Sequence, residues 1–157
     1  MSVAFRRESD EEHLEPRFEL PIPVGPNLVT RRGHALIVAR NADLEALLVL
    51  AEGEEARKPV LRDLRYWRNR LATAHVAPPA TGEIVAIGTR VTFHRDGIPR
   101  TIDIVGHDES DPATSRLAYS APLARALIGA RVGDEVDAPG SDSTLEVISI
   151  EPLPDEG

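Results

Sequence analysis

The stretch of sequence that decides the fold is VTFHRDGIPRTIDIV, residues 91–105. Apolar and polar residues alternate near both ends of this stretch, which is the period of a β-strand with one buried face. Asp96-Gly97 lies between the two alternating runs, and this dipeptide favours the tight turn of a β-hairpin. Residues 84–87 and 145–150 also have strand composition. Together these runs predict a mainly antiparallel sheet in the C-terminal half of the chain.

A short helix is expected between the last two predicted strands. Residues 121–129 read APLARALIG, with Pro122 near the start, where its missing N–H would have no partner, and Gly129 at the end. One short helix against a mainly antiparallel sheet is an α+β domain. We place this domain at residues 82–153.

Upstream of residue 78 the apolar periodicity is helical. Asn27 or Thr30 can cap a first helix, whose apolar residues would be Leu36, Ile37, Leu44, Leu47, Leu48 and Ala51. A second helix is expected from Pro59, which suits a first turn; its apolar seam would be Val60, Leu64, Trp67, Leu71 and Ala74. This helix must end before Pro78-Pro79. The pattern predicts an antiparallel helical hairpin, a short coiled coil, over residues 30–77.

Residues 1–29 differ in composition from the rest of the chain. They are charged and contain four prolines, Pro16, Pro21, Pro23 and Pro26. Such a segment cannot bury enough apolar surface to fold alone. We therefore assign residues 1–29 to a tail.

The net charge of −8 argues against a protein that binds nucleic acid strongly by itself, because phosphate neutralisation supplies most of that affinity. The charge is nevertheless uneven along the chain. Residues 31–75 carry nine basic and six acidic residues, whereas both flanks are acidic. A charged partner surface would account for this asymmetry, and so would a solvated helix face.

Several classes of site are absent from the sequence. Without cysteine the chain has no disulfide, thiolate metal site or cysteine nucleophile. No run approaches the roughly 20 apolar residues of a membrane helix, and the N-terminus is charged where a signal peptide would be apolar. We expect a soluble, cytoplasmic protein without cofactor. We also expect no metal site, because no ligand spacing relates the five histidines, His13, His34, His75, His94 and His107.

Four blocks of the C-terminal half resemble the C-terminal domain of GreA/GreB-type transcription elongation factors, in the order and spacing of that family. They are residues 87–92 (IGTRVT), 104–112 (IVGHDESDP), 120–129 (SAPLARALIG) and 132–136 (VGDEV). Residues 61–71 (LRDLRYWRNRL) look like the returning helix of the family's N-terminal hairpin. The resemblance implies an FKBP-like C-terminal domain at the rim of the RNA polymerase secondary channel, with the hairpin directed inward and core RNA polymerase as the partner.

The resemblance also implies a docking loop. Pro122 matches the proline of the family's polymerase-docking loop, and Leu123 and Arg125 lie on the same helix start. Ser120 stands where the family often has an acidic residue, so a charged contact would be lost here. A helix that merely begins with proline would show the same residues, and both interpretations can hold together.

The hairpin tip departs from that of the cleavage factors. Their tip carries a motif close to Asp-Leu-Ser-Glu-Asn-Ala-Glu-Tyr, whose acids help to hold the second catalytic metal. Here the motif is missing, and the hairpin is several turns shorter, as in the Rnk-like relatives. The acids near the tip are Glu52, Glu54 and Glu55. They could hold a cation with ligands borrowed from the polymerase, or they could be solvated acids that favour the next helix dipole.

Two further charged groups have alternative interpretations. The series Arg62, Arg65, Arg68 and Arg70 could meet an acidic channel wall, with Arg62 and Arg65 projecting from the far side of the second helix, or form an exposed helix surface. The acid-rich stretch 108–111 (DESD) lacks the spacing and the central glycine of an EF-hand loop, so we interpret it as a structural turn.

Three functions follow from these observations. The first is an RNA polymerase-binding regulator at the secondary channel that is not itself an enzyme and at most assists the polymerase's own RNA cleavage. The second is an active cleavage-stimulating factor that uses Glu52, Glu54 or Glu55. The third is a prolyl isomerase, suggested only by the FKBP-like fold. Fold alone does not carry function, and three Phe, two Tyr and one Trp leave few residues for an aromatic proline pocket. The first is our prediction, and the sequence does not indicate the oligomeric state.

Overall fold

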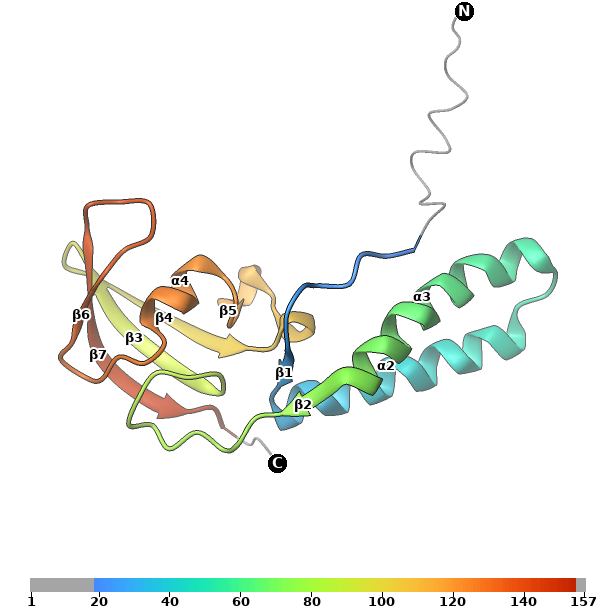
Figure 1. Cartoon of the computed structure of the whole chain (residues 1–157), viewed down its shortest axis with the longest axis horizontal. Helices are drawn as coiled ribbons and strands as arrows, with labels where there is room; N and C mark the ends of the chain where they lie inside the picture. The colour runs from blue at the N-terminus through green and yellow to red at the C-terminus, as the bar shows by residue number, and fades with distance from the viewer. Residues whose placement is uncertain (1–18, 155–157) are drawn as a thin grey trace, which may run out of the picture. The chain divides into compact units, whose positions relative to one another are not determined.

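The computed structural model describes residues 19–154, so residues 1–18 of the predicted tail lie outside the described part of the chain. In chain order the elements are β1 (Asn27–Val29), α2 (Arg31–Leu50), α3 (Glu54–Thr73), β2 (Ala74–Val76), β3 (Thr89–Arg95), β4 (Ile98–Val105), the 3-10 turns η1 (His107–Glu109) and η2 (Pro112–Thr114), β5 (Arg116–Ala118), α4 (Pro122–Leu127), β6 (Glu135–Asp137) and β7 (Thr144–Pro152) (Figure 1). Two compact units result: residues up to Val24 with Val38–Ala72, and Gly25–Ile37 with the residues from Thr73 onward.

The second unit is built on a five-stranded sheet with the strand order β5-β4-β3-β7-β6. β3 pairs antiparallel with β4 and with β7, and β6 pairs antiparallel with β7. β5 is parallel to β4. Asp96 and Gly97, with φ angles of 54° and 78°, form the predicted turn between β3 and β4. The predicted α+β class, with a mainly antiparallel sheet and one short helix, is confirmed.

One face of this sheet carries the hydrophobic core. Alternate residues of β3, β4 and β7 point into it, as the period of two requires. The helix α4 contributes Ala124 and Leu127, both fully buried. The buried strand residues of this core are Val91, Phe93, Ile102, Ile104, Leu145 and Val147. The core therefore fixes the position of α4 on the sheet.

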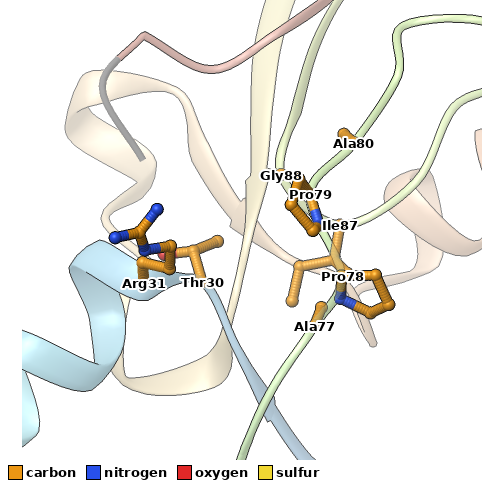
Figure 2. A pocket seen from close by; sticks show the side chains of 8 residues that line it. All are labelled: Thr30, Arg31, Ala77, Pro78, Pro79, Ala80, Ile87 and Gly88. Atoms are coloured by element: carbon orange, nitrogen blue, oxygen red, sulfur yellow. The ribbon is translucent and has the colours of Figure 1, made fainter. Parts of the chain in front are cut away.

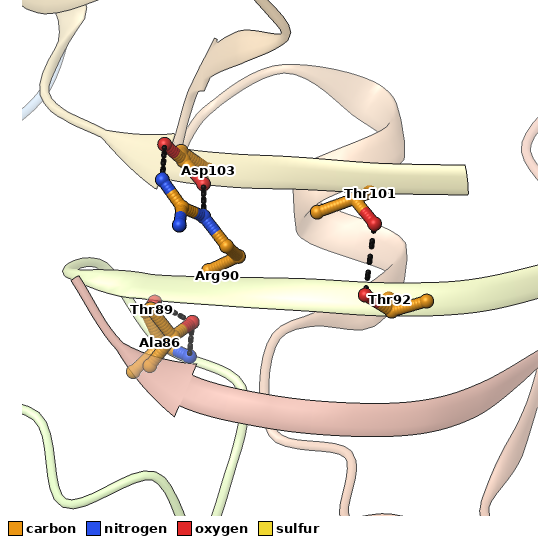
Figure 3. Close-up of polar contacts among 6 residues, drawn as sticks. All are labelled: Ala86, Thr89, Arg90, Thr92, Thr101 and Asp103. Atoms are coloured by element: carbon orange, nitrogen blue, oxygen red, sulfur yellow. Dashed lines mark hydrogen bonds and ion pairs between the residues drawn. The ribbon is translucent and has the colours of Figure 1, made fainter. Parts of the chain in front are cut away.

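The side chains of β3 and β4 that point away from the core form polar cross-strand pairs (Figure 3). Arg90 binds Asp103 through two nitrogen–oxygen contacts of 2.8 and 3.1 Å, and the hydrogen bond to Asp103 raises the pKa of Arg90. The hydroxyl oxygens of Thr92 and Thr101 lie 2.8 Å apart. Such pairs stabilise one register of the two strands.

Residues 84–87 do not form the predicted strand. Val85 is fully buried, and its backbone exchanges hydrogen bonds with Gly129 (2.8 Å) and Ala130 (2.9 Å) at the end of the α4 segment. Thr89 closes a turn on Ala86, because its hydroxyl donates to the Ala86 carbonyl at 2.6 Å and accepts from the Ala86 N–H at 3.2 Å (Figure 3). The strand prediction was wrong because this short apolar run packs as a loop whose backbone groups find partners outside a strand ladder.

Residues 27–29, which the sequence placed in the tail, form β1 and pair in parallel with β2. Tyr119 ties this segment to the five-stranded sheet: its hydroxyl donates to the Pro26 carbonyl at 2.5 Å and accepts from the Leu28 N–H at 3.4 Å. Asn27 also donates to the Thr73 hydroxyl at 3.1 Å. The first residues of the hairpin segment and the last residue of α3 thus belong to the same unit as the sheet.

Thr30 is the N-cap of α2. Its hydroxyl accepts a hydrogen bond from the Gly33 N–H at 2.9 Å and donates to the Glu109 carboxylate at 2.8 Å. The same carboxylate accepts from the Gly106 N–H at 3.2 Å and from the Thr30 N–H at 3.4 Å. A negative charge is favourable at this end of a helix. The acidic turn after β4 is therefore structural, as predicted, and Glu109 is the residue that gives it this role.

Gly33 leaves the space that the Glu109 carboxylate fills. A Cβ at residue 33 would lie 2.1 Å from Glu109 Oε2, so the carboxylate would have to leave its donors. We expect Gly33→Ala to lower the free energy of unfolding by about 1–2 kcal/mol, because lost charged hydrogen bonds outweigh the better helix propensity of alanine. In a Glu109→Ala background the same change should instead stabilise by up to about 1 kcal/mol. Urea unfolding of the four variants tests this, and the same sign in both backgrounds would contradict it.

The first unit is the helical hairpin. α2 and α3 are antiparallel neighbours joined through Gly53, which has a φ of 86° (Figure 1). Leu44 and Leu64 are buried. Asn41 donates to the Trp67 carbonyl at 3.0 Å, and Arg68 binds Glu45 at 2.9 Å. The predicted hairpin is thus present, with helices of 20 residues, or about 30 Å, each.

Some details of the hairpin differ from the predictions. α3 begins at Glu54 and contains Pro59, because acidic residues at its start favour the dipole and a proline this near the start removes only one helical hydrogen bond. Ala74 lies in β2 and not in the helical seam. Leu36 and Leu47 are 40% and 51% exposed, so the predicted seam of α2 is narrower than the sequence suggested.

Candidate functional site

The predicted docking residues gather at the start of α4. Ser120 and Pro122 are exposed, Pro122 occupies the first helical position, and Arg125 is exposed one turn later. Leu123 is only half-buried and packs against the core. The predicted residues therefore separate into three solvent-facing ones and one that anchors the helix.

The backbone around α4 is fixed on both sides. Tyr119 donates its N–H to the Val105 carbonyl and Ala121 donates to Ala118, each at 2.9 Å. After the helix, Gly129 adopts a φ of 95° and donates to Val85 at 2.8 Å. Proline fixes its own φ, so the chain enters the helix in one conformation. The backbone that carries Pro122 and Arg125 is therefore held in one conformation, and both residues are exposed.

The acids of the hairpin tip surround a glycine. Glu52, Glu54 and Glu55 are exposed, and the Glu55 side chain retains 91% of its accessible surface while it pairs with Lys58 at 3.5 Å. Gly53 lies between Glu52 and Glu54 in the left-handed region. The three acids are thus near one another in the sequence, but in the described part of the chain no surrounding side chains pack against them to fix their positions.

The predicted arginines of α3 have different environments. Arg65 is 55% exposed at its side chain and binds Glu19 at 2.5 Å, and Arg62 is 18% exposed and binds Asp63 at 3.2 Å. Arg68 binds Glu45. Arg70 is buried, with its guanidinium 5.9 Å from the centre of the Tyr66 ring, so its predicted place in an exposed series was wrong. Of the two candidate channel contacts, Arg65 is therefore more accessible than Arg62.

A small pocket lies where the Ala77–Ala80 segment approaches the start of α2. Thr30 and Arg31 line one side, and Pro78, Ile87 and neighbouring small residues line the other (Figure 2). Its interior has room for about one water molecule. The pocket is therefore too small to receive a proline-containing peptide.

Within residues 19–154, no three His, Asp or Glu side chains are placed so that they could hold a metal ion together. In the same range of residues, no helix combines the length and apolar character needed to cross a membrane.

Sequence reasoning missed Tyr119 and Glu109, which join the residues around β1 to the sheet. Tyr119 directly precedes the docking loop, and Glu109 lies in the acidic block that we interpreted as a turn. A capping carboxylate distant in sequence from its helix leaves no local spacing signal, so only the tertiary structure identifies these partners.

Comparison with known proteins finds related sequences. The family model described as "Transcription elongation factor, GreA/GreB, C-term" matches residues 80–152. GreA of Sinorhizobium medicae is 32% identical over 120 residues, 73% of this chain and 72% of the relative. GreB of Neisseria meningitidis serogroup B is 35% identical over 105 residues, 63% of this chain and 64% of the relative, so this match spans slightly less than two thirds of that GreB.

Solved structures include the GreA factor homolog Gfh1 of Thermus thermophilus, which is 16% identical, has a TM-score of 0.40 and covers 81% of this chain and 99% of its own. The sequence matches are the stronger finding, because the 32% identity to the Sinorhizobium GreA extends over nearly three quarters of both chains. The chain belongs to the GreA/GreB family of transcription elongation factors.

Proposed function

We propose that this protein binds core RNA polymerase through the start of α4 and regulates elongation from the secondary channel without strong stimulation of transcript cleavage. The observation that carries the proposal is the exposure of Pro122 and Arg125 on a helix whose other side is locked into the core by Ala124 and Leu127. Arginine is one of the residue types that are enriched among the main energetic contributors to protein–protein interfaces. We propose that the protein acts in the cytoplasm, where RNA polymerase is found.

Ser120 modifies this docking surface. It is exposed and neutral, where the family often has an acidic residue. A hydroxyl cannot form the charge-assisted hydrogen bonds that a carboxylate forms with a basic partner. We therefore propose that apolar contact at Pro122 and the charge of Arg125 carry the interface.

Arg65 and Arg62 are proposed contacts of the hairpin with the acidic wall of the channel. Arginine suits this role because its guanidinium binds carboxylates through two parallel hydrogen bonds. Arg65 is the better candidate, because its side chain is 55% exposed and its carboxylate partner Glu19 is itself exposed. Arg62 would first have to leave Asp63.

The structure of the hairpin tip favours weak stimulation of transcript cleavage. Metal-assisted hydrolysis requires carboxylates held at metal-ligand distance, whereas Glu52 and Glu54 flank a glycine and Glu55 is paired with Lys58. Each hairpin helix is only 20 residues long. A displacement of about 1 Å can cost on the order of 10²-fold in rate. A protein with this tip would obstruct the channel more than it assists catalysis there.

With the protein at saturation, we expect the polymerase of a backtracked elongation complex to cleave its RNA at least on the order of 10²-fold more slowly than with a GreB-type factor. Replacing Glu52, Glu54 and Glu55 together with alanine should leave the small residual rate unchanged. The measurement is single-turnover cleavage of labelled RNA, with occupancy of the complex verified separately. Strong stimulation by the wild type that disappears in the triple variant would establish an active cleavage factor instead.

A further inference from the structure

The outward face of α3 is a basic stripe. Lys58, Arg62, Arg65 and Asn69 follow one another at intervals of four, three and four residues, which places them on one side of the helix, away from the buried Leu64. Lys58 and Arg65 are well exposed, with 66% and 55% of their side-chain surface accessible. We call Lys58, Arg62 and Arg65 the basic stripe; Asn69 continues the same side of the helix without a charge.

Glu19 is already bound to this stripe. Its Oε1 lies 2.5 Å from Arg65 Nε, in a contact between residues 46 positions apart in the sequence. The hydrogen bond from Arg65, together with the positive charges of Arg65 and Arg62, lowers the pKa of Glu19. The stripe therefore attracts a carboxylate from the N-terminal segment of the same chain.

The residues that precede Glu19 are complementary to the stripe. Residues 8–15 read ESDEEHLE and contain five acidic residues and no basic one. Glu15 is four residues from Glu19, and an extended chain covers about 3.3 Å per residue, so it can reach about 13 Å. Lys58 lies seven residues before Arg65, which is about 10 Å along a helix. Lys58 and Arg62 are thus within reach of this acidic segment.

We propose that the acidic segment 8–15 docks on the basic stripe of α3 in the same chain, extending the contact that Glu19 makes with Arg65. We expect the segment to run toward the N-terminus of α3, because Arg62 and Lys58 lie on that side of Arg65, whereas only the neutral Asn69 follows on the other. The segment is tethered within a few residues of its target, which gives it a high effective concentration. The docked segment covers the two arginines that a charged partner would otherwise contact, and it is displaced by salt.

Lys58 allows a direct test because it is the sole lysine of the chain. A carbodiimide adds no spacer, so it joins an amine to a carboxylate only when the two groups meet directly. In the full-length protein at low ionic strength, we expect peptide mapping by mass spectrometry to find Lys58 amides with carboxylates of segment 8–15. The product with Glu55, which lies 3.5 Å from Lys58, serves as the internal reference. Amides with the hairpin-tip acids alone would overturn the proposal.

A double variant separates docking from chance encounter. Arg62→Gln with Arg65→Gln retains Lys58 and every tail carboxylate, and glutamine has good helix propensity. We expect the double variant to reduce the yield of Lys58 amides with segment 8–15 severalfold relative to the Lys58–Glu55 amide. The control is Arg68→Gln, because Arg68 binds Glu45 and does not belong to the basic stripe. We expect this control to leave the ratio of the two products unchanged. An unchanged ratio in the double variant would refute the docking. Mixed isotopically labelled and unlabelled chains complete the test, since predominantly intermolecular tail products would assign the segment to a second copy. None of these measurements involves polymerase, so their outcome is independent of the proposed function.

Discussion

Replacement of Pro122 by glutamate is expected to weaken binding to core RNA polymerase by at least about tenfold, a loss of about 1.4 kcal/mol. Pro122 is exposed at the first position of α4, where the docking surface would meet its partner. Glutamate replaces the apolar ring by a charge that would have to be desolvated in the interface, and it removes the fixed φ of proline. It does not threaten the helix, because an acid at a helix start is favourable. The affinity can be measured by titration of labelled polymerase.

The matched control is Ile98→Glu. Ile98 is also an exposed apolar residue of the second unit, 67% accessible, but it follows the β3–β4 turn rather than the docking loop. We expect this variant to bind like the wild type. Equal affinity of a folded Pro122→Glu variant and the wild type would place the interface elsewhere on the protein.

Phe93→Ala is expected to lower the free energy of unfolding of the protein by about 3–5 kcal/mol. Phe93 is fully buried in β3, the middle strand of the five-stranded sheet, and it belongs to the same core as Ala124 and Leu127 of α4. Removal of the ring leaves a cavity that the surrounding strands cannot close. Urea unfolding followed by circular dichroism measures the loss.

Thr92→Ala serves as the control for this prediction, because Thr92 adjoins Phe93 and points to the other side of the sheet. It loses only the hydroxyl contact with Thr101, so the expected cost is about 0.2–1 kcal/mol. Similar costs for the two variants would contradict the assignment of the core face, and with it the positioning of α4.

The elements that could be predicted from the sequence are those with local signals. Asp96-Gly97 requires a tight turn whatever surrounds it, and proline at the start with glycine after the end delimits α4. Residues 84–87 were misassigned because a short apolar run has the same composition in a buried loop as in a strand. Only the backbone partners of Val85, which lie more than forty residues later, decide between the two.

The candidate site could be predicted only in part, because its long-range contacts leave no local signal in the sequence. The resemblance gave Pro122 and Arg125, which the fold exposes, but it could not show that Leu123 packs against the core. Helical spacing also could not show that Arg70 is buried over Tyr66 or that Glu109 caps α2, because both depend on neighbours that the sequence does not place. Long-range side-chain partners are the part that the sequence leaves open.

Competitive binding to core RNA polymerase tests the central claim most directly. The chain has no cysteine, so Asp142→Cys in the exposed loop before β7 provides one site for a fluorescent label. Titration with core polymerase should give saturable binding, and an unlabelled GreB-type factor should displace the labelled protein completely, because both would occupy the secondary channel. Absence of binding, or binding that saturating GreB-type factor leaves intact, would contradict the account.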